Sequence, residues 1–165
     1  MELAEKYIEG VLNGKVICGL TVKQAIQRHL NDIIKSESKD FDYYFDKKRA
    51  SLACKAIRMM PHTSGSVSGK PFQLEGWQAF IVWSLYGWRK KVTKTSRYRK
   101  VYIKIARKNG KTEFLAAIAN LDLIFFPIDG AEMFWAATKK EQAKIGWKRQ
   151  KKMIDTLISR SKSIK

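Results

Sequence analysis

The chain has 165 residues, which is enough to bury the core of one domain or slightly more, and this length excludes a short peptide-like module. Its 33 Lys and Arg residues outnumber 15 Asp and Glu residues and give a net charge of +18, with an isoelectric point near 10.0. This charge favours a polyanionic partner, nucleic acid before membrane, and no apolar run approaches the roughly 18 residues of a membrane span.

The N-terminal portion is predicted to be helical. Apolar residues at helical spacing predict a helix over residues 3–12 and a second one that starts with Thr21 as its N-cap. Asp46 is expected to cap a third helix, which ends at Met60 because Pro61 follows. The Gly/Ser-rich stretch 62–70 then predicts a boundary, so we divide the chain into a helical portion, 1–70, and a second portion, 71–165.

The second portion is predicted to alternate helices and strands. Its expected elements, in order, are a helix at 79–88, a basic connector at 89–100, a strand to Ala106, a loop and helix to about Phe125, a strand at 132–137, and a basic helix at 140–158. Two strands that are separated by a helix predict the parallel βαβ layer of an α/β fold.

The turn Arg107–Thr112 lies between the first predicted strand and its helix. In this layout backbone N–H groups and a helix N-terminus can surround a phosphate chain. Gly110 would let the backbone approach the phosphates, Lys111 would contact their oxygens, and Thr112 would offer its hydroxyl to Mg²⁺. The usual motif has a glycine five positions before Gly110, where this chain has Ile105. An ordinary basic turn between a strand and a helix is the alternative.

The positive charge is concentrated before and after this turn. No acidic residue occurs from Gly76 to Thr112, and a second basic cluster covers residues 139–152. These clusters could contact nucleic acid or form a solvated basic face, and the aromatic residues among them could stack on bases or belong to a core. Cys18 and Cys54 have no metal-binding spacing and are expected to be buried thiols in a reducing compartment.

Several stretches resemble the N-terminal part of phage terminase large subunits, the DNA-packaging ATPases of tailed phages. The resemblance covers nearly the whole chain. The sequence is similar to the subgroup whose phosphate loop reads Arg-Lys-Asn-Gly-Lys-Ser/Thr. In that subgroup the departure at Ile105 is normal. The matching stretches are Tyr7–Leu30, His62–Phe72, Leu74–Gln78, Phe80, Gly87-Trp88, Ala106–Thr112, Ala136–Thr138 and Gln142-Ala143.

The resemblance implies the first βαβ units of a P-loop NTPase sheet of the additional-strand, helicase-like type, with ATP and Mg²⁺ as cofactors. It implies Trp77 and Gln78 near the adenine and Thr112 on Mg²⁺. The expected phosphate contacts come from the loop residues Arg107, Lys108, Asn109, Gly110 and Lys111, with catalytic roles for Lys111 and Arg107. From the residues alone, Gln78 could equally be a polar residue of a first helical turn, and Arg107 and Lys108 could bind DNA.

The resemblance also implies partners that the residues do not specify. These are double-stranded DNA, the portal protein, the terminase small subunit and, in the full-length protein, further copies of itself, in the host cytoplasm and transiently at the procapsid portal. We expect the family's acidic Walker B strand and its nuclease domain to be absent from these residues. Asp129 is not the Walker B acid in this interpretation, because it lies too close to Lys111 and is followed by Gly130. We expect the full-length protein to be an ATPase and endonuclease and this chain alone to be inactive.

Two alternatives stay open at this point. The chain could be a basic DNA-binding module without nucleotide chemistry, which contacts phosphates through residues 89–100 and 139–152. It could also use its helical residues 1–60 to dock on a partner protein.

Overall fold

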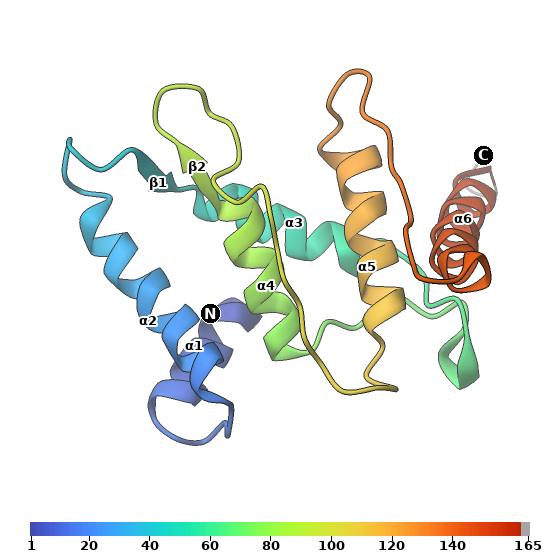
Figure 1. Cartoon of the computed structure of the whole chain (residues 1–165), viewed down its shortest axis with the longest axis horizontal. Coiled ribbons are helices and arrows are strands. Elements are labelled where there is room, and N and C mark those ends of the chain that lie inside the picture. The colour runs from blue at the N-terminus through green and yellow to red at the C-terminus, as the bar shows by residue number, and fades with distance from the viewer. Residues whose placement is uncertain (163–165) are drawn as a thin grey trace. The chain divides into compact units, whose positions relative to one another are not determined.

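The computed structural model describes residues 1–162, which divide into two compact units. Unit 1 contains Met1–Cys54 and Leu74–Tyr102, and unit 2 contains Lys55–Gln73 and Ile103–Lys165. Each unit is therefore built from two separate stretches of the sequence (Figure 1). The predicted division into 1–70 and 71–165 stays a prediction about the family's domains.

Unit 1 is mainly helical. Helices α1 (Leu3–Leu12), α2 (Leu20–Lys35) and α4 (Gly76–Gly87) lie where apolar periodicity predicts helices. Their apolar faces meet in a core that contains Ile8, Val11, Ile26 and Phe80. The N-cap of α2 is Gly19, so the expected cap at Thr21 is wrong. Helix α2 therefore begins at Leu20, one residue before the predicted N-cap.

A short antiparallel pair of strands completes unit 1. Strand β1 (Tyr43–Phe45) pairs with β2 (Trp88–Lys90), and Phe45 lies opposite Trp88. Gly87 is required beside this pair, because a Cβ at position 87 would lie 2.2 Å from Cε2 of Phe45. The sequence did not predict these strands, since three residues are too few to show an alternating pattern.

Helix α3 (Lys47–Met59) belongs to unit 1 up to Cys54 and to unit 2 from Lys55 onward. Its predicted cap is confirmed, because Oδ1 of Asp46 accepts a hydrogen bond from the backbone N–H of Arg49 at 2.9 Å. Cys54 is buried, and its thiol lies 3.8 Å from the carbonyl oxygen of Ala79. Desolvation by burial raises the pKa of Cys54 to about 12. Cys18, by contrast, is only partly buried.

Unit 2 contains the short 3₁₀ turn η1 (Gly65–Val67), helix α5 (Lys111–Asn120), its π-helical continuation η2 (Leu121–Phe125), and the long helix α6 (Lys140–Lys162). Helices α5 and α6 pack together around Phe114, Leu121 and Met153, which are fully buried. The helix that the sequence predicts from the end of the loop to about Phe125 and the one that it predicts at 140–158 are therefore confirmed.

Asn120 and Gln150 add polar contacts to this core. The side-chain amide of Asn120 donates to the carbonyl oxygen of Gln150 at 3.1 Å, and the indole N–H of Trp135 donates to Oε1 of Gln150 at 2.5 Å. Gly146 lets the indole of Trp135 pack against α6, because a Cβ there would lie 2.1 Å from Cε3 of Trp135. Segment 131–137 is thus fastened to α6 through its tryptophan.

The mixed α/β composition is confirmed, but the sheet differs in kind from the expected one. Among residues 1–162 the one sheet is the antiparallel pair β1–β2, and segments 101–106 and 131–137 are neither helix nor strand. Tyr102 and Phe134 in these segments are 87% and 80% exposed. The parallel P-loop sheet therefore stays a prediction. No helix within residues 1–162 is long and apolar enough to cross a membrane.

Candidate nucleotide site

The loop Arg107–Thr112 forms a compact turn at the start of α5, in unit 2. Lys108 and Gly110 both have left-handed backbone conformations, with φ of 66° and 67°. The side-chain amide of Asn109 donates to the carbonyl oxygens of Ala106 and Arg107, each at 3.3 Å. These hydrogen bonds close the turn on itself, so that Gly110 becomes the N-cap of α5.

The start of α5 is open to an anionic group. Gly110 has no atom within 4 Å of the position that a Cβ would occupy, and no side chain caps the helix. The first N–H groups of a helix lack intrahelical partners, and the helix dipole favours negative charge near them. The backbone at Gly110 and Lys111 therefore fits a phosphate group, which could approach closely where glycine has no side chain.

Three cations surround this turn. Arg107, Lys108 and Lys111 are exposed, and within residues 1–162 none of them forms an ion pair with a carboxylate. Thr112 is half-buried in the first turn of α5. The predicted phosphate-contacting residues are thus brought together in one turn, with their charges not neutralised by neighbouring acids.

Glu113 follows this turn and has an unusually dense set of partners. Its carboxylate is 12% exposed and accepts hydrogen bonds from the backbone N–H of Thr63 and from the Thr63 hydroxyl, the latter at 2.9 Å. The Arg149 guanidinium lies 3.2 Å from its Oε2. The hydroxyl of Ser64 lies 3.5 Å from the same oxygen. These groups connect the start of α5 with the 63–64 turn and with α6.

The 63–64 turn receives further contacts from α6. Arg149 donates to the Ser64 hydroxyl at 2.7 Å and to the Thr63 hydroxyl at 3.3 Å, and Lys152 donates to the carbonyl oxygen of Thr63 at 2.6 Å. His62 stacks on Phe72, with ring centroids 4.7 Å apart. Residues 63 and 64 of the predicted boundary stretch are therefore hydrogen-bonded to α6 within unit 2.

Sequence reasoning missed Thr63, Glu113 and Arg149 as site residues. One signal could have indicated Glu113, because it is the first acidic residue after the stretch from Gly76 to Thr112 that has none. Its partners could not be inferred, since Thr63 and Arg149 lie 50 and 36 residues away in the sequence.

Trp77 and Gln78 lie in the first turn of α4, in unit 1. Gln78 is buried, and its Oε1 accepts a hydrogen bond from the backbone N–H of Glu75 at 2.9 Å. This contact is the one expected of a polar residue in a first helical turn. Since the loop belongs to unit 2, the role of Trp77 and Gln78 beside an adenine ring stays a prediction.

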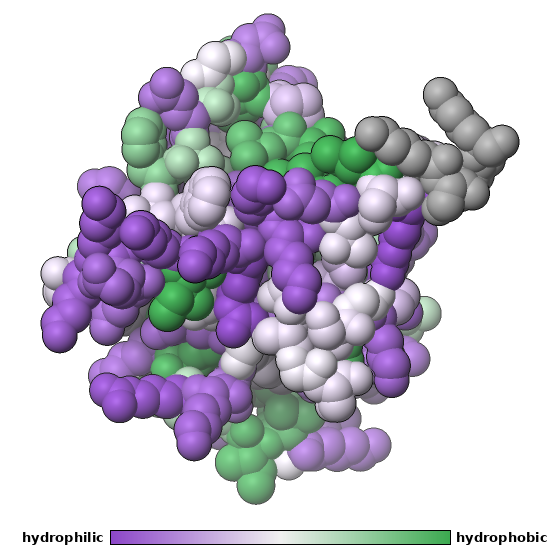
Figure 2. Space-filling model, turned by 90° about the vertical axis from the view of Figure 1, so that its right-hand side faces the viewer, coloured by the Kyte–Doolittle hydropathy of each residue, from purple (hydrophilic) through white to green (hydrophobic). Residues whose placement is uncertain are grey.

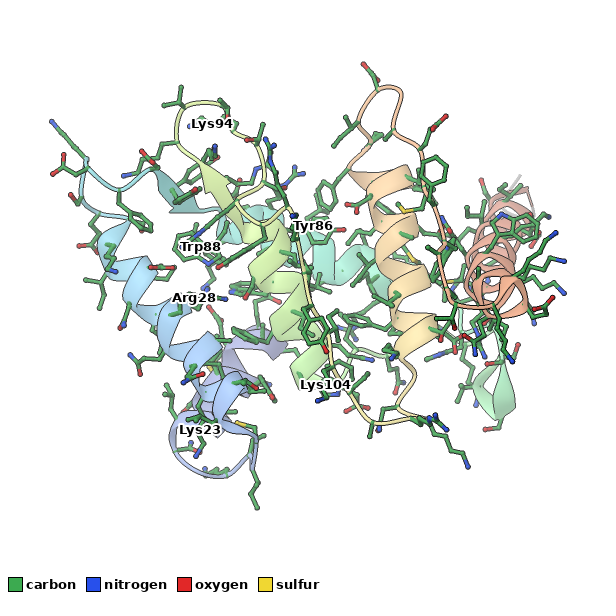
Figure 3. The ribbon with its side chains drawn as sticks, viewed as in Figure 1. Lys23, Arg28, Tyr86, Trp88, Lys94 and Lys104 are labelled. Carbon is green, nitrogen blue, oxygen red and sulfur yellow. The ribbon has the colours of Figure 1, made fainter. Side chains whose placement is uncertain are left out.

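The basic connector 89–100 folds back on unit 1. Arg97 pairs with the buried Asp32 at 2.8 Å, and its guanidinium lies over the rings of Phe41, Tyr43, Trp88 and Tyr98 at 4.6 to 5.4 Å. Lys94 lies 4.7 Å from the ring centroid of Tyr44. Trp88 and Tyr86, which are labelled in Figure 3, are both buried. Tyr86 and Trp88 therefore belong to the core, whereas Phe41, Tyr43, Tyr44 and Tyr98 are partly buried and in part contact cations of the connector.

A different basic surface lies on α6. Lys140, Lys144 and Lys148 follow one another at four-residue intervals and are exposed. Figure 2 shows hydrophilic side chains spread over the face of the molecule that includes α6, with smaller hydrophobic patches between them. This stripe provides positive charge that is free to meet an anionic partner.

The described residues contain no preformed metal site of the usual kind. Within residues 1–162 no group of three or more His, Cys, Asp and Glu side chains could hold a metal ion. A Mg²⁺ ion that is bound through phosphate oxygens, water and one hydroxyl needs no such group. Thr112 is the hydroxyl that the turn places at the start of α5.

Comparison with known proteins assigns the family. A family model for the ATPase domain of the terminase large subunit matches residues 76–165, which is more than half of the chain. The match includes the loop, α5 and α6, and it begins at the first residue of α4. Searches of the curated proteins and of the solved structures returned no match. The match over residues 76–165 places this chain in the terminase large subunit ATPase-domain family.

Proposed function

We propose that the turn Arg107–Thr112 binds Mg-ATP, and that the chain is the nucleotide-binding segment of a terminase large subunit which powers the packaging of double-stranded DNA into a procapsid. The observation that carries the proposal is the open, uncapped start of α5 at a left-handed Gly110, next to three cations without acidic partners. The family match independently implies nucleotide use.

Each residue of the turn has a distinct role in this proposal. Gly110 and the first amides of α5 bind phosphate oxygens, and Lys111 places its ammonium group against them. Lys108 and Asn109 shape the turn, the former through its left-handed backbone and the latter through its hydrogen bonds to Ala106 and Arg107. Thr112 presents its hydroxyl to Mg²⁺.

Arg107 would stabilise the negative charge that develops on a transferred phosphoryl group. That phosphoryl group comes from bound Mg-ATP. Hydrolysis of the ATP would be the energy source of the complete motor. No carboxylate in the turn is placed to orient an attacking water, so this chain alone is expected to bind nucleotide and to turn it over negligibly.

The proposal is tested by thermal unfolding with and without Mg-ATP. A ligand that binds the folded chain raises its stability by about 2.7 kcal/mol at 100 times the dissociation constant. Lys111→Ala should abolish this gain and leave the unliganded chain equally stable, because Lys111 is exposed. Lys23→Ala is the matched control, since Lys23 is an exposed lysine of α2 in unit 1 (Figure 3). An equal gain in the wild type and in Lys111→Ala would refute the assignment.

A second role, DNA binding, is favoured by the exposed lysines of α6. If Lys140, Lys144 and Lys148 each neutralise one phosphate, their joint replacement by Gln should reduce the slope of log K against log salt by about 2.7. Titration of a fluorescent duplex at several salt concentrations measures this slope. An unchanged slope would exclude these lysines as phosphate contacts. An unchanged response to Mg-ATP in the same variant would separate DNA binding from nucleotide binding.

The remaining partners follow from the family proposal alone. We expect the complete protein to assemble with further copies of itself, with the small subunit and with the portal protein, in the host cytoplasm and at the procapsid. Docking through residues 1–60 is the alternative use of the N-terminal helices. Deletion of residues 1–35 followed by a pull-down with portal or small subunit tests this use. Circular dichroism must show that the rest of unit 1 stays folded, because α1 and α2 contribute Ile8, Val11 and Ile26 to its core.

A further inference from the structure

Helices α1, α4 and α5 each have Glu or Gln as their third residue, but these side chains make two different kinds of contact. In α1, Oε2 of Glu5 accepts a hydrogen bond from the backbone N–H of Glu2 at 3.0 Å. In α4, Gln78 accepts one from Glu75 at 2.9 Å. Both side chains reach back to the N-cap of their own helix, which is the ordinary capping arrangement.

In α5 the equivalent residue is Glu113, and it does not reach back. No side chain caps this helix, and the Glu113 carboxylate is directed at the 63–64 turn and at α6. A carboxylate at this position is well suited to cap its own helix, and here that contact is given up. The backbone N–H of Gly110, which such a contact would occupy, is therefore not taken up by Glu113.

The alternative partners of Glu113 hold it from both sides. Oε1 accepts from the backbone and the hydroxyl of Thr63, while Oε2 faces Arg149 and Ser64. Thr63 is 5% exposed and is itself bound by Arg149. Charge-assisted hydrogen bonds to a mostly buried carboxylate are the strong ones, so this cluster fixes the position of Glu113 in unit 2.

From this arrangement we infer that Glu113 is a positioning residue for the phosphate loop, and that Thr63 and Arg149 clamp it. The inference rests on the proposed function of the loop. Lys111 and Thr112 immediately precede Glu113 in the same helical turn, so fixing Glu113 fixes the direction in which their side chains and the first amides of α5 face. Glu113 touches no phosphate in this scheme and acts through its two neighbours.

The test combines hydrogen exchange with nucleotide-dependent stability in the full 165-residue chain. Glu113→Gln keeps the shape of the side chain but removes its charge. Thr63→Val removes one hydroxyl, and Thr63→Ser restores it as the conservative rescue. Glu141→Gln is the matched control, because Glu141 lies exposed in the first turn of α6 and forms no ion pair among residues 1–162.

Exchange of the backbone amides is followed by mass spectrometry in a peptide that spans 107–116, first without nucleotide. We expect Glu113→Gln to exchange about tenfold faster in this segment, Thr63→Val less so, and Thr63→Ser and Glu141→Gln as the wild type does. The concentration of Mg-ATP that gives half of the thermal stabilisation should rise about tenfold in Glu113→Gln.

The outcomes separate the clamp from the nucleotide site. If Mg-ATP stabilises the wild type and Glu113→Gln equally, and their exchange rates agree, the clamp is overturned and the proposed function stands. If Mg-ATP has no effect on the wild type, the proposed function fails. Whether Glu113 holds the loop in place is then decided by comparing exchange in the wild type and in Glu113→Gln without nucleotide. Should Glu113→Gln not fold, a shift in Thr63→Val that Thr63→Ser reverses would support the clamp, and equal behaviour of these two variants would overturn it.

Discussion

Units 1 and 2 each contain an ion pair between an arginine and a largely buried carboxylate, and the surroundings of the two pairs differ. In unit 1, Asp32 and Arg97 lie 2.8 Å apart, and aromatic rings enclose the arginine. In unit 2, Glu113 and Arg149 lie 3.2 Å apart among the hydroxyl groups of a turn. The first pair lies among aromatic rings, whereas the second is attached to α5, the helix that starts at the turn Arg107–Thr112.

Similar ion pairs can therefore serve separate purposes in one chain. An ion pair whose arginine is enclosed by aromatic rings stabilises the unit that contains it, and the loss of its carboxylate should affect folding first. A carboxylate beside hydroxyl groups, one residue after Thr112, can be altered with less damage to the core and with a direct effect on the loop. The predictions below test this distinction.

Asp32→Asn should cause the largest loss of stability. The substitution leaves the Arg97 guanidinium partly buried without its counter-charge, and breaking a buried pair in this way costs about 3–5 kcal/mol. Urea unfolding at neutral pH measures the change. Replacing both partners together, as Asp32→Asn with Arg97→Met, should cost less than the single change. A single-variant loss below about 1 kcal/mol would show that the pair contributes little to unit 1.

The histidine beside this pair should make unit 1 sensitive to acid. Burial is the main cause that lowers the pKa of His29 to about 4, with a smaller opposing effect from Asp32. An unfolded chain protonates this histidine near its ordinary pKa of 6.5, whereas the folded chain stays neutral until about pH 4. The folded state therefore binds fewer protons in this window, and stability falls as the pH decreases from 6.5 to 4, by roughly 3 kcal/mol.

His29→Gln should remove this part of the pH dependence. Glutamine can still accept the hydrogen bond that the indole N–H of Trp88 donates to His29 at 3.0 Å, but it does not titrate. The measurement compares the wild type and the variant by urea unfolding at pH 7 and pH 4.5. The effects of the other titrating groups, which both proteins share, cancel in the difference between their free energies of unfolding. Parallel curves for the two proteins would contradict the prediction.

Thr63→Val should have a moderate effect on unit 2. The hydroxyl of Thr63 donates to Glu113 and accepts from Arg149, and valine keeps its shape without either bond. The expected loss is about 1 kcal/mol, which is typical of one hydrogen bond whose partners keep other contacts. Thermal unfolding monitored by circular dichroism measures it. A loss of stability as large as that of Asp32→Asn would mean that the two ion pairs contribute equally to the free energy of unfolding.

Lys151→Gln should have the smallest effect and provides the baseline. Lys151 and Asp155 form an ion pair at 2.8 Å on the surface of α6, with side chains 57% and 56% exposed. Exposed pairs of this kind contribute less than about 0.5 kcal/mol. The same thermal unfolding assay checks it, and a change above 1 kcal/mol would show that surface charge on α6 matters for folding.

The sequence predicts the helices well and the sheet poorly, for physical reasons. Helices α1, α4 and α6 carry long apolar patterns that local spacing reveals. Strands β1 and β2 have three residues each, and their pairing depends on Phe45 and Trp88, which are distant in the sequence. The apolar runs 101–106 and 131–137 have the composition of strands, but a strand also needs a partner to accept its hydrogen bonds.

The candidate site shows the same limit. The turn Arg107–Thr112 could be found from local order, because glycine, lysine and threonine are adjacent in the sequence. The residues that hold it in place could not, since Thr63, Glu113 and Arg149 meet only after α5 and α6 have packed. Arg97 shows the opposite error, because a basic residue in a basic connector turned out to be enclosed by aromatic rings.

The contrast between the two cysteines has a practical consequence for experiments on this chain. Cys54 is buried with a pKa of about 12, so at neutral pH almost none of it is the thiolate that reacts with maleimides. Cys18 is partly exposed and becomes the preferred point of attachment. A single fluorophore can therefore be placed in unit 1 without first removing a cysteine, and its emission would report on that unit separately from events at the loop in unit 2.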